Sequence, residues 1–156
     1  TSEKGVLLIV NDRPDIALAA DADGVHLGQE DLTASAARKL IGPEKILGVS
    51  ASALALALKA QEDGADYVGI GSIYPTITKK LTAPPAGPEL IMAFRGRLDI
   101  PFVPLGGISA RNVREVIAAG ARSIAVCSAL VSAPDIAEAT RQLKELMMRA
   151  MENMPA

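Results

Sequence analysis

The stretch that decides the fold is Ala22-Asp23-Gly24-Val25-His26-Leu27-Gly28-Gln29. Its first four residues resemble two later segments, Gly64-Ala65-Asp66-Tyr67-Val68 and Gly120-Ala121-Arg122-Ser123-Ile124. Each copy leads into a short apolar run, and runs of that length favour a strand over a helix. The recurrence therefore predicts a chain assembled from several similar units, each containing one strand.

Six such apolar runs are predicted strands. They lack clean alternation of polar and apolar residues, so both faces of each strand should be buried, as in parallel strands covered by helices. Most of them begin about 20 residues apart, which suits a compact unit of one strand and one helix with short loops. The runs are Val6–Val10, Gly24–Leu27, Ile46–Ser50, Tyr67–Gly71, Phe102–Leu105 and Ile124–Cys127.

Helical segments are predicted between the strands. Thr33 is a candidate N-cap for the first full helix, and a shorter helix is predicted over Ala17–Ala20, after Pro14. A long loop rich in proline should follow the fourth strand, since Pro75, Pro84, Pro85 and Pro88 all lie there. The other predicted helices are Thr33–Ile41, Ser52–Glu62, Ser109–Ala119 and about Asp135–Met151.

Composition indicates one globular domain over residues 1–156 and excludes several classes of protein. A net charge of -2, two Phe, two Tyr and no Trp argue against nucleic-acid or anionic-membrane partners, which need basic surfaces or stacking platforms. A single cysteine excludes an internal disulfide framework and a cysteine-rich zinc site. Without a signal peptide or a long apolar run, a cytoplasmic location is the expectation.

Consecutive strand–helix units give either an open doubly wound sheet or a barrel. The dinucleotide fingerprint of the open sheet is absent, and polar or glycine residues follow nearly every strand, as at the active-site end of a (β/α)8 TIM barrel. A whole barrel needs about 200 residues or more, so we expect six of its eight units here, with the amino-terminal part missing. The unpaired sheet edges that this leaves should favour self-association.

Two acidic residues at neighbouring strand ends suggest a metal site. Asn11-Asp12 follows the first predicted strand, and Asp31 follows the second by four residues. Carboxylates that converge there would suit Mg²⁺, which prefers hard oxygen ligands and keeps waters and phosphate oxygens. The alternative is ordinary turn chemistry, for which Asn and Asp are well suited.

Two further features would suit a phosphorylated ligand. The loop Pro75-Thr76-Ile77-Thr78-Lys79-Lys80 offers hydroxyl and ammonium groups, although it would also suit a plain polar loop. Gly106-Gly107 and Cys127-Ser128 follow the last two strands, where this barrel commonly binds phosphate on backbone N–H groups. The alternative for the glycines is a tight turn.

The remaining reactive residue types give no catalytic set. His26 lies inside a predicted strand, without a second histidine in the chain, and is interpreted as structural. Cys127 has no evident partner base and is expected to pack rather than react. No combination of Ser, His and Asp for nucleophilic catalysis is evident.

Five motifs, taken in order, resemble the signatures of the thiamine phosphate synthase family. They span nearly the whole chain, and their order at plausible spacing is far more specific than any one of them. The motifs are Leu8-Ile9-Val10-Asn11-Asp12-Arg13, Ala22 through Asp31, Gly48-Val49-Ser50-Ala51, Pro75 through Lys80, and Gly106-Gly107-Ile108.

The resemblance implies a (β/α)8 barrel that joins a pyrimidine diphosphate to a thiazole phosphate and releases pyrophosphate. It implies Asp12 and Asp31 as ligands of Mg²⁺. It further implies contacts to the pyrimidine diphosphate from Asn11, Ser50 and Lys79, with Ser50 and Lys79 the catalytic candidates. The thiazole phosphate would be held by Thr76, Ile77, Thr78, Gly107, Cys127 and Ser128.

One departure from the family bears on activity. Its Gln-x-Arg-x-Lys segment, which belongs to the second strand of the barrel and contacts the pyrimidine diphosphate, is nowhere in the sequence. We therefore expect weak turnover from this chain alone. A related thiazole tautomerase is one alternative, but its histidine shortly after the third visible strand is absent from Ser50-Ala51-Ser52. A non-catalytic phosphate-binding barrel fragment is the other.

Overall fold

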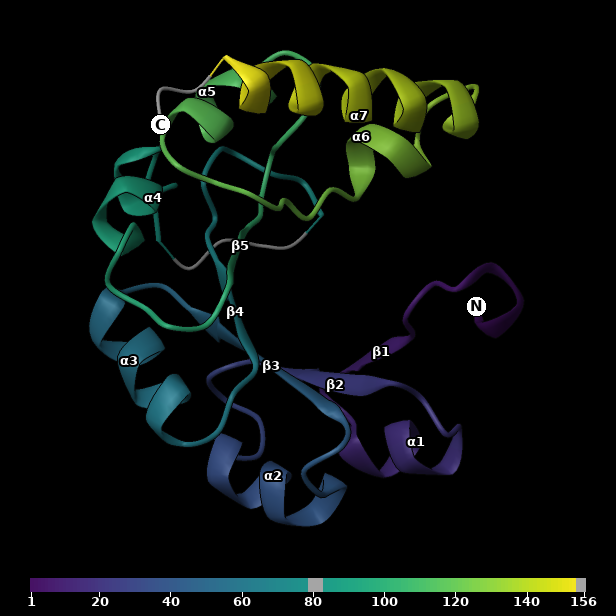
Figure 1. Cartoon of the computed structure of the whole chain (residues 1–156), viewed down its shortest axis with the longest axis vertical. Helices are drawn as coiled ribbons and strands as arrows, with labels where there is room; N and C mark the ends of the chain where they lie inside the picture. The colour runs from purple at the N-terminus through teal and green to yellow at the C-terminus, as the bar shows by residue number, and fades with distance from the viewer. Residues whose placement is uncertain (79–82, 154–156) are drawn as a thin grey trace. The chain divides into compact units, whose positions relative to one another are not determined.

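The computed structural model describes residues 1–78 and 83–153. These residues form one five-stranded sheet in the order β1-β2-β3-β4-β5 (Figure 1). Strand β2 pairs in parallel with β1, in the register Ile9↔Gly24, and with β3, in the register Gly24↔Ile46. The strands are β1 Ile9–Asn11, β2 Gly24–Leu27, β3 Ile46–Ala51, β4 Tyr67–Ile70 and β5 Phe102–Pro104.

The prediction of a sixth strand over Ile124–Cys127 was wrong. This segment forms only an isolated parallel bridge between Leu105 and Ala125, with the Ala125 N–H donating to the Pro104 carbonyl at 2.9 Å. Within the described ranges it has a pairing partner along one side only, so few ladder hydrogen bonds hold it extended. The same reasoning accounts for β1, which is shorter than the predicted run from Val6 to Val10.

The predicted helices are present, with shifted ends. The Thr33 hydroxyl accepts the Ala36 N–H at the start of α2, and the Asp135 carboxylate accepts the Glu138 N–H at the start of α7. Helix α5 starts later than predicted because the Asn112 side chain accepts the Ser109 N–H and holds that stretch as a turn. The helices are α1 Pro14–Ala19, α2 Ala34–Ile41, α3 Leu54–Glu62, α5 Val113–Ala118 and α7 Ile136–Glu152.

Three short elements were not predicted: η1 Ser2–Lys4, α4 Glu89–Phe94 and α6 Ser128–Val131. Helix α4 lies in the stretch predicted as loop, directly after Pro88. Its Ile91 and Phe94 are fully buried, and the Phe94 ring packs edge-on against Phe102 with centroids 6.1 Å apart. Burial of that apolar face stabilises the helix, although the prolines that precede it in the sequence indicated a loop.

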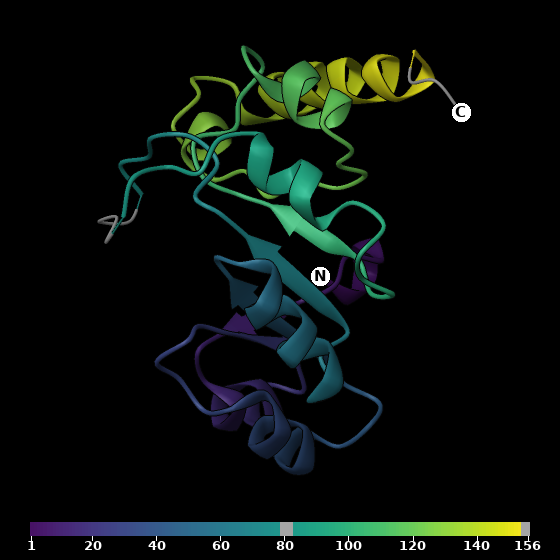
Figure 2. The same ribbon diagram turned by 90° about the vertical axis from the view of Figure 1, so that its left-hand side faces the viewer.

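The chain divides into two compact units. The first contains Thr1–Gly69 and Leu98–Pro101, and its helices α1, α2 and α3 pack against β1, β2 and β3 (Figure 1). The second contains Ile70–Arg97 and Phe102–Ala156, and in it α5 packs along α7 (Figure 2). Strands β2, β3 and β4 are buried along most of their length, as predicted for strands covered on both faces.

The recurring sequence has a recurring structural role. In each copy a buried alanine donates its N–H to the carbonyl five residues earlier, in the preceding helix: Ala22 to Ala17, Ala65 to Ala60 and Ala121 to Val116. This bond satisfies a carbonyl that the end of a helix leaves without an intrahelical partner. Alanine is small enough to be buried at that turn, so each repeat marks the passage from a helix into the next strand.

Arg38 on α2 ties together the segments that enter β3 and β4. Its guanidinium donates to the carbonyl oxygens of Gly42, Lys45 and Gly64 and to the carboxylate of Asp66, at 2.5–3.1 Å. These segments lie at the amino ends of the strands, the side of a barrel that serves stability rather than catalysis.

Replacing Arg38 by lysine should lower the free energy of unfolding by about 2–3 kcal/mol, because an ammonium group cannot reproduce the planar fork and leaves carbonyls without a donor. Urea denaturation of the variant measures this loss. The matched control is Lys39→Ala, an exposed position next to Arg38 in the same helix, which should change stability by less than about 0.5 kcal/mol. Equal midpoints for the two variants would contradict the role assigned to Arg38.

In the part of the chain that the structure describes, no helix is both long enough and apolar enough to cross a membrane.

Candidate functional site

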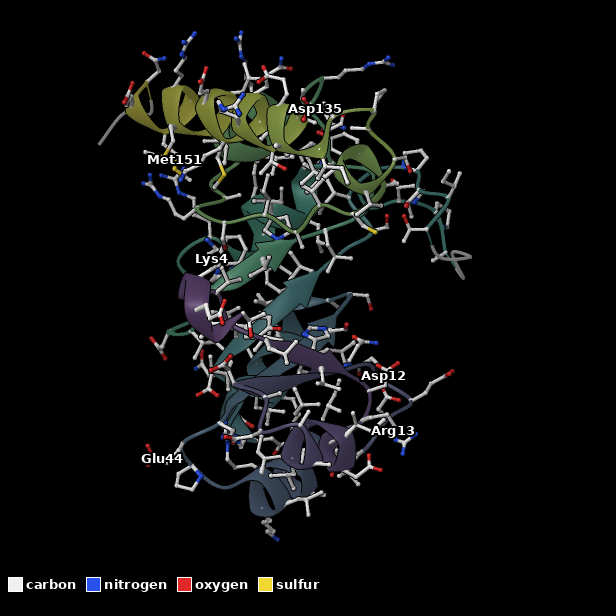
Figure 3. All side chains as sticks on the ribbon, turned by 90° about the vertical axis from the view of Figure 1, so that its right-hand side faces the viewer. Lys4, Asp12, Arg13, Glu44, Asp135 and Met151 are labelled. Carbon is white, nitrogen blue, oxygen red and sulfur yellow. The ribbon has the colours of Figure 1, made fainter. Side chains whose placement is uncertain are left out.

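Both acidic residues of the predicted metal site lie at the carboxyl edge of β1 and β2, in the first unit. The Asp12 N–H donates to the His26 carbonyl at 2.8 Å and so continues the pairing of the two strands. Asp31 folds back toward the end of β2, where one of its carboxylate oxygens accepts the Gly28 N–H at 2.7 Å. Figure 3 shows Asp12 on the loop that leaves β1.

The backbone at Asp12 is unusual, with a φ of 64°. A residue with a side chain rarely takes this left-handed conformation, and such residues cluster at functional sites, where the surrounding structure holds them. The Arg13 N–H donates to the Asn11 carbonyl at 2.9 Å, which closes a tight turn around Asp12. The exposed Asn11 side chain belongs to the last residue of β1, so Asn11 and Asp12 lie at the same strand end.

The donor chemistry of these two residues could hold a magnesium ion only together with ligands from outside the protein. The described residues contain no group of three or more His, Cys, Asp or Glu able to hold a metal on their own. Two carboxylates are nevertheless enough for Mg²⁺, which is commonly bound through one or two protein carboxylates together with waters and substrate phosphates. The Gly28 amide occupies one oxygen of Asp31, and the other keeps its capacity for coordination.

Ser50 lies near the carboxyl end of β3, in the same unit, with hydrogen bonds to two side chains from neighbouring segments. Its hydroxyl lies 2.9 Å from Nε2 of His26, and its carbonyl accepts from Nε2 of Gln29 at 2.5 Å. Nδ1 of His26 lies 3.0 Å from the Tyr67 hydroxyl. Burial lowers the pKa of His26, although the charge of Asp31 opposes that shift, and burial raises the pKa of Tyr67.

The sequence-based interpretation of His26 as structural missed this contact with Ser50. The available signal was the period-two pattern of a strand, which places His26 on the face opposite Val25 and Leu27. Those two side chains are almost fully buried, whereas His26 is intermediate in burial.

The predicted thiazole-phosphate loop lies in the second unit, against the Gly106-Gly107 turn. The Ile73 N–H donates to the Leu105 carbonyl at 2.9 Å and the Tyr74 N–H to the Gly106 carbonyl at 3.0 Å. The loop then runs outward, since Ile77 is 95% exposed. The Thr78 N–H donates to the Thr76 hydroxyl at 3.2 Å, and this bond shapes the turn between them. Lys79 and Lys80, which follow, lie outside the described residues.

Gly107 cannot carry a side chain without moving this loop. Its φ is 65°, and a Cβ atom there would lie 2.4 Å from the Pro75 carbonyl oxygen and 2.8 Å from the Cβ of Tyr74. The residue before Thr76 therefore rests directly on Gly107, which joins two of the predicted phosphate-binding features.

If this loop holds the thiazole phosphate, as the resemblance implies, replacing Gly107 by alanine should weaken that binding by about tenfold or more, because the Pro75 backbone must shift to admit the methyl group. Steady-state KM for the thiazole phosphate measures the effect. Gly96→Ala is the matched control: Gly96 has a similar φ of 68°, but a Cβ atom there would have no atom within 4 Å. A similar change in KM for both variants would mean that the strain of a side chain at positive φ weakens binding, and that the contact between Gly107 and Pro75 does not matter.

Cys127 and Ser128 lie where the chain enters the short helix α6. The expectation that Cys127 packs was wrong, because the residue is exposed as a free thiol. Its carbonyl accepts the N–H groups of Leu130 and Val131 at 2.9 and 3.0 Å, which fixes the turn that begins at Ser128.

The chain is similar to proteins of one family along nearly its whole length. The family model described as thiamine monophosphate synthase matches residues 1–130. The thiamine-phosphate synthase of Moorella thermoacetica is 53% identical over 96% of this chain and 71% of its own length. That of Chloroflexus aurantiacus is 51% identical over 97% and 70%.

Solved structures confirm the fold. A thiamine phosphate pyrophosphorylase from Pyrococcus furiosus is 41% identical and superposes with a TM-score of 0.88 over 97% of this chain and 72% of its own. A 3-hexulose-6-phosphate synthase, 23% identical, shares the fold alone, with a TM-score of 0.65 over 86% of this chain and 66% of its own. The expected TIM-barrel architecture of this type is thereby confirmed, and the chain belongs to the thiamine-phosphate synthase family.

Proposed function

We propose that this chain belongs to an enzyme that forms thiamine phosphate, and that the carboxyl edge of its parallel strands carries the active site. The reaction joins 4-amino-2-methyl-5-hydroxymethylpyrimidine diphosphate to thiazole phosphate and releases pyrophosphate. The observation that carries this proposal is the position of Asp12 and Asp31 at the carboxyl edge of two adjacent parallel strands, in a chain of this family. That edge is where barrels of this kind conduct their chemistry.

The first unit would bind the pyrimidine diphosphate. Asp12 and Asp31 are the proposed ligands of Mg²⁺, which when bound would offset the negative charge of the diphosphate. Asn11 ends β1 and Ser50 lies one residue before the end of β3, on either side of β2, and their amide and hydroxyl groups suit phosphate oxygens. Lys79 would add a positive charge on the leaving group.

The second unit would bind the thiazole phosphate. Thr76 and Thr78 supply hydroxyl groups, and the backbone of Ile77, whose side chain is exposed, supplies an N–H. Gly107 would support this loop, because its backbone packs directly against the Pro75 carbonyl. Cys127 and Ser128 complete the proposed set at the strand end where barrels commonly bind phosphate.

The bond chemistry explains why no protein nucleophile is needed. The C–O bond between the pyrimidine methylene and the diphosphate breaks, and both electrons leave with pyrophosphate. The thiazole nitrogen then donates its lone pair to the methylene carbon, which forms the C–N bond of thiamine phosphate. The residues of the chain contribute by stabilising the departing negative charge and by holding the thiazole ring in line through its phosphate.

A coupled assay of pyrophosphate release, with product identified by mass spectrometry, tests the proposal. The 156-residue chain is compared with the same chain extended at its amino end by a segment that carries a Gln-x-Arg-x-Lys strand. We expect weak turnover from the chain alone and clear, Mg²⁺-dependent turnover when a Gln-x-Arg-x-Lys strand is supplied. A folded extended chain that forms no thiamine phosphate would contradict the proposed function and favour a non-catalytic phosphate-binding role.

The cytoplasmic location, the absence of nucleic-acid partners and self-association through sheet edges stay predictions from the sequence.

A further inference from the structure

His26 connects the side chains of three neighbouring strands of the first unit. It projects from β2, and its two ring nitrogens lie within hydrogen-bond distance of Ser50 on β3 and Tyr67 on β4. The separations are 2.9 Å from Nε2 to the Ser50 hydroxyl and 3.0 Å from Nδ1 to the Tyr67 hydroxyl. The neutral ring carries a single N–H, so one of these bonds must be donated by His26 and the other accepted.

Tyr67 is held against His26 by a glycine. A Cβ atom at Gly48 would lie 2.2 Å from Cζ of Tyr67 and 2.4 Å from its hydroxyl oxygen, so the phenol ring lies directly on the backbone of β3. Gly48 is also the register partner of His26. The rings of His26 and Tyr67 lie 5.4 Å apart at a tilt of 34°. The phenol hydroxyl thus has a defined position at Nδ1.

The direction of the two hydrogen bonds follows from the needs of each hydroxyl. If Tyr67 donates to Nδ1, then Nε2–H donates to Ser50, and the Ser50 hydroxyl proton is the one left for a partner outside these two bonds. In the opposite direction Nδ1–H donates to Tyr67 and the Ser50 hydroxyl donates to Nε2. The proton of the partly buried Tyr67 hydroxyl then has no acceptor among the hydrogen bonds of the described residues. Ser50 lies near the carboxyl end of β3, where a ligand can accept its proton, whereas the Tyr67 ring is packed on the backbone of Gly48, so the first direction is the one that a ligand at Ser50 favours.

We propose that Tyr67 and His26 are positioning residues. They form a hydrogen-bond relay that orients the Ser50 hydroxyl as a hydrogen-bond donor to an anionic diphosphate oxygen. In this relay His26 is the Nε2–H tautomer. The inference deepens the proposed function, on which the identity of the ligand rests. It explains why a strand interior carries a histidine: a hydroxyl that accepts from Nε2–H keeps its own proton for the ligand, whereas an untethered serine rotates among several partners.

The tautomer is directly measurable, because His26 is the only histidine in the chain. Long-range ¹H–¹⁵N correlation spectra of the ¹⁵N-labelled chain should show protonated Nε2 and unprotonated Nδ1. Tyr67→Phe, which removes only the hydroxyl, should shift the ring toward a mixture of tautomers. A wild-type ring protonated at Nδ1 would overturn the relay. This measurement needs neither substrate nor activity.

Pyrophosphate with Mg²⁺ is the probe for the second step. By calorimetry, Tyr67→Phe and Ser50→Ala should each weaken pyrophosphate binding by about tenfold, the effect of one charge-assisted hydrogen bond. The double variant should be no weaker than Ser50→Ala, since both changes remove the same donor. Ser52→Ala, an exposed serine two residues further on, is the matched control and should bind as the wild type does.

The outcomes separate this inference from the proposed function. Equal pyrophosphate affinity of Tyr67→Phe and the wild type, with both folded by thermal melting, would overturn the relay. A wild-type chain that does not bind pyrophosphate would overturn the role of Ser50 as donor. A chain with the relay and pyrophosphate binding intact but without thiamine phosphate formation in its extended form would contradict the function alone.

Discussion

Replacing Asp31 by asparagine should reduce the turnover number for thiamine phosphate formation by about 100-fold or more, with little loss of stability. The reason is that the side chain has two separable roles. Its oxygen accepts the Gly28 N–H at 2.7 Å, and an amide oxygen can do the same. Its negative charge is the part that the proposed Mg²⁺ would require of a ligand, and asparagine lacks it.

Two further substitutions make this test specific. Asp31→Ala loses both roles, so it should show the same loss of turnover together with a destabilisation of about 1 kcal/mol from the orphaned Gly28 amide. Glu30→Gln removes an equal charge from the exposed adjacent residue and should leave turnover within about twofold. The assay is pyrophosphate release by the extended chain across a Mg²⁺ titration. Turnover of Asp31→Asn close to that of the wild type would remove Asp31 from the metal site.

Local patterning predicted the central elements of the fold well. Strands β2, β3 and β4 match their predicted runs to within one residue at each end, because buried parallel strands are bounded sharply by the glycines and polar residues of their turns. The cap Thr33 was recognised because side-chain capping is a short-range interaction that adjacent residues largely determine, whereas Asp135 was predicted only as the approximate start of its helix. These features depend on little beyond the segment itself.

The errors arose where a long-range contact decides the local structure. The segment Ile124–Cys127 has the composition of a strand but pairs through a single bridge, and strand pairing depends on neighbours that composition does not reveal. Helix α4 depends on burying Phe94 against Phe102, which follows it on β5. His26 was identified in the right strand, yet its partners Ser50 and Tyr67 lie 24 and 41 residues away.

The candidate site shows the same division. The position of Asp12 and Asp31 at one strand edge was predicted, since parallel strands bring their carboxyl ends to the same side. The hydrogen bond from Gly28 to Asp31 was not, nor was the close approach of Pro75 to Gly107. Such contacts depend on loop backbone conformations, including the positive φ angles at Asp12 and Gly107, that residue type only weakly constrains.

The pair Lys79 and Lys80 offers a sharp test of a residue-specific role, because the two residues are adjacent in the sequence and carry the same charge. Lys79→Ala should lower the turnover number by about 100-fold or more, since the negative charge on departing pyrophosphate grows toward the transition state and Lys79 is its proposed protein partner. Lys80→Ala, the matched control, should lower it by no more than about threefold, the effect of diffuse charge in solvent.

The kinetic form of the loss separates catalysis from simple attraction. If Lys79 stabilises the leaving group, turnover falls while KM for the pyrimidine diphosphate changes little, and Lys79→Arg recovers part of the rate by restoring the charge. If the loop acts only as a basic patch, the two alanine variants raise KM equally, and raising the salt concentration produces the same effect in the wild type. Equal behaviour of the two lysines would therefore contradict a contact between Lys79 and the departing diphosphate.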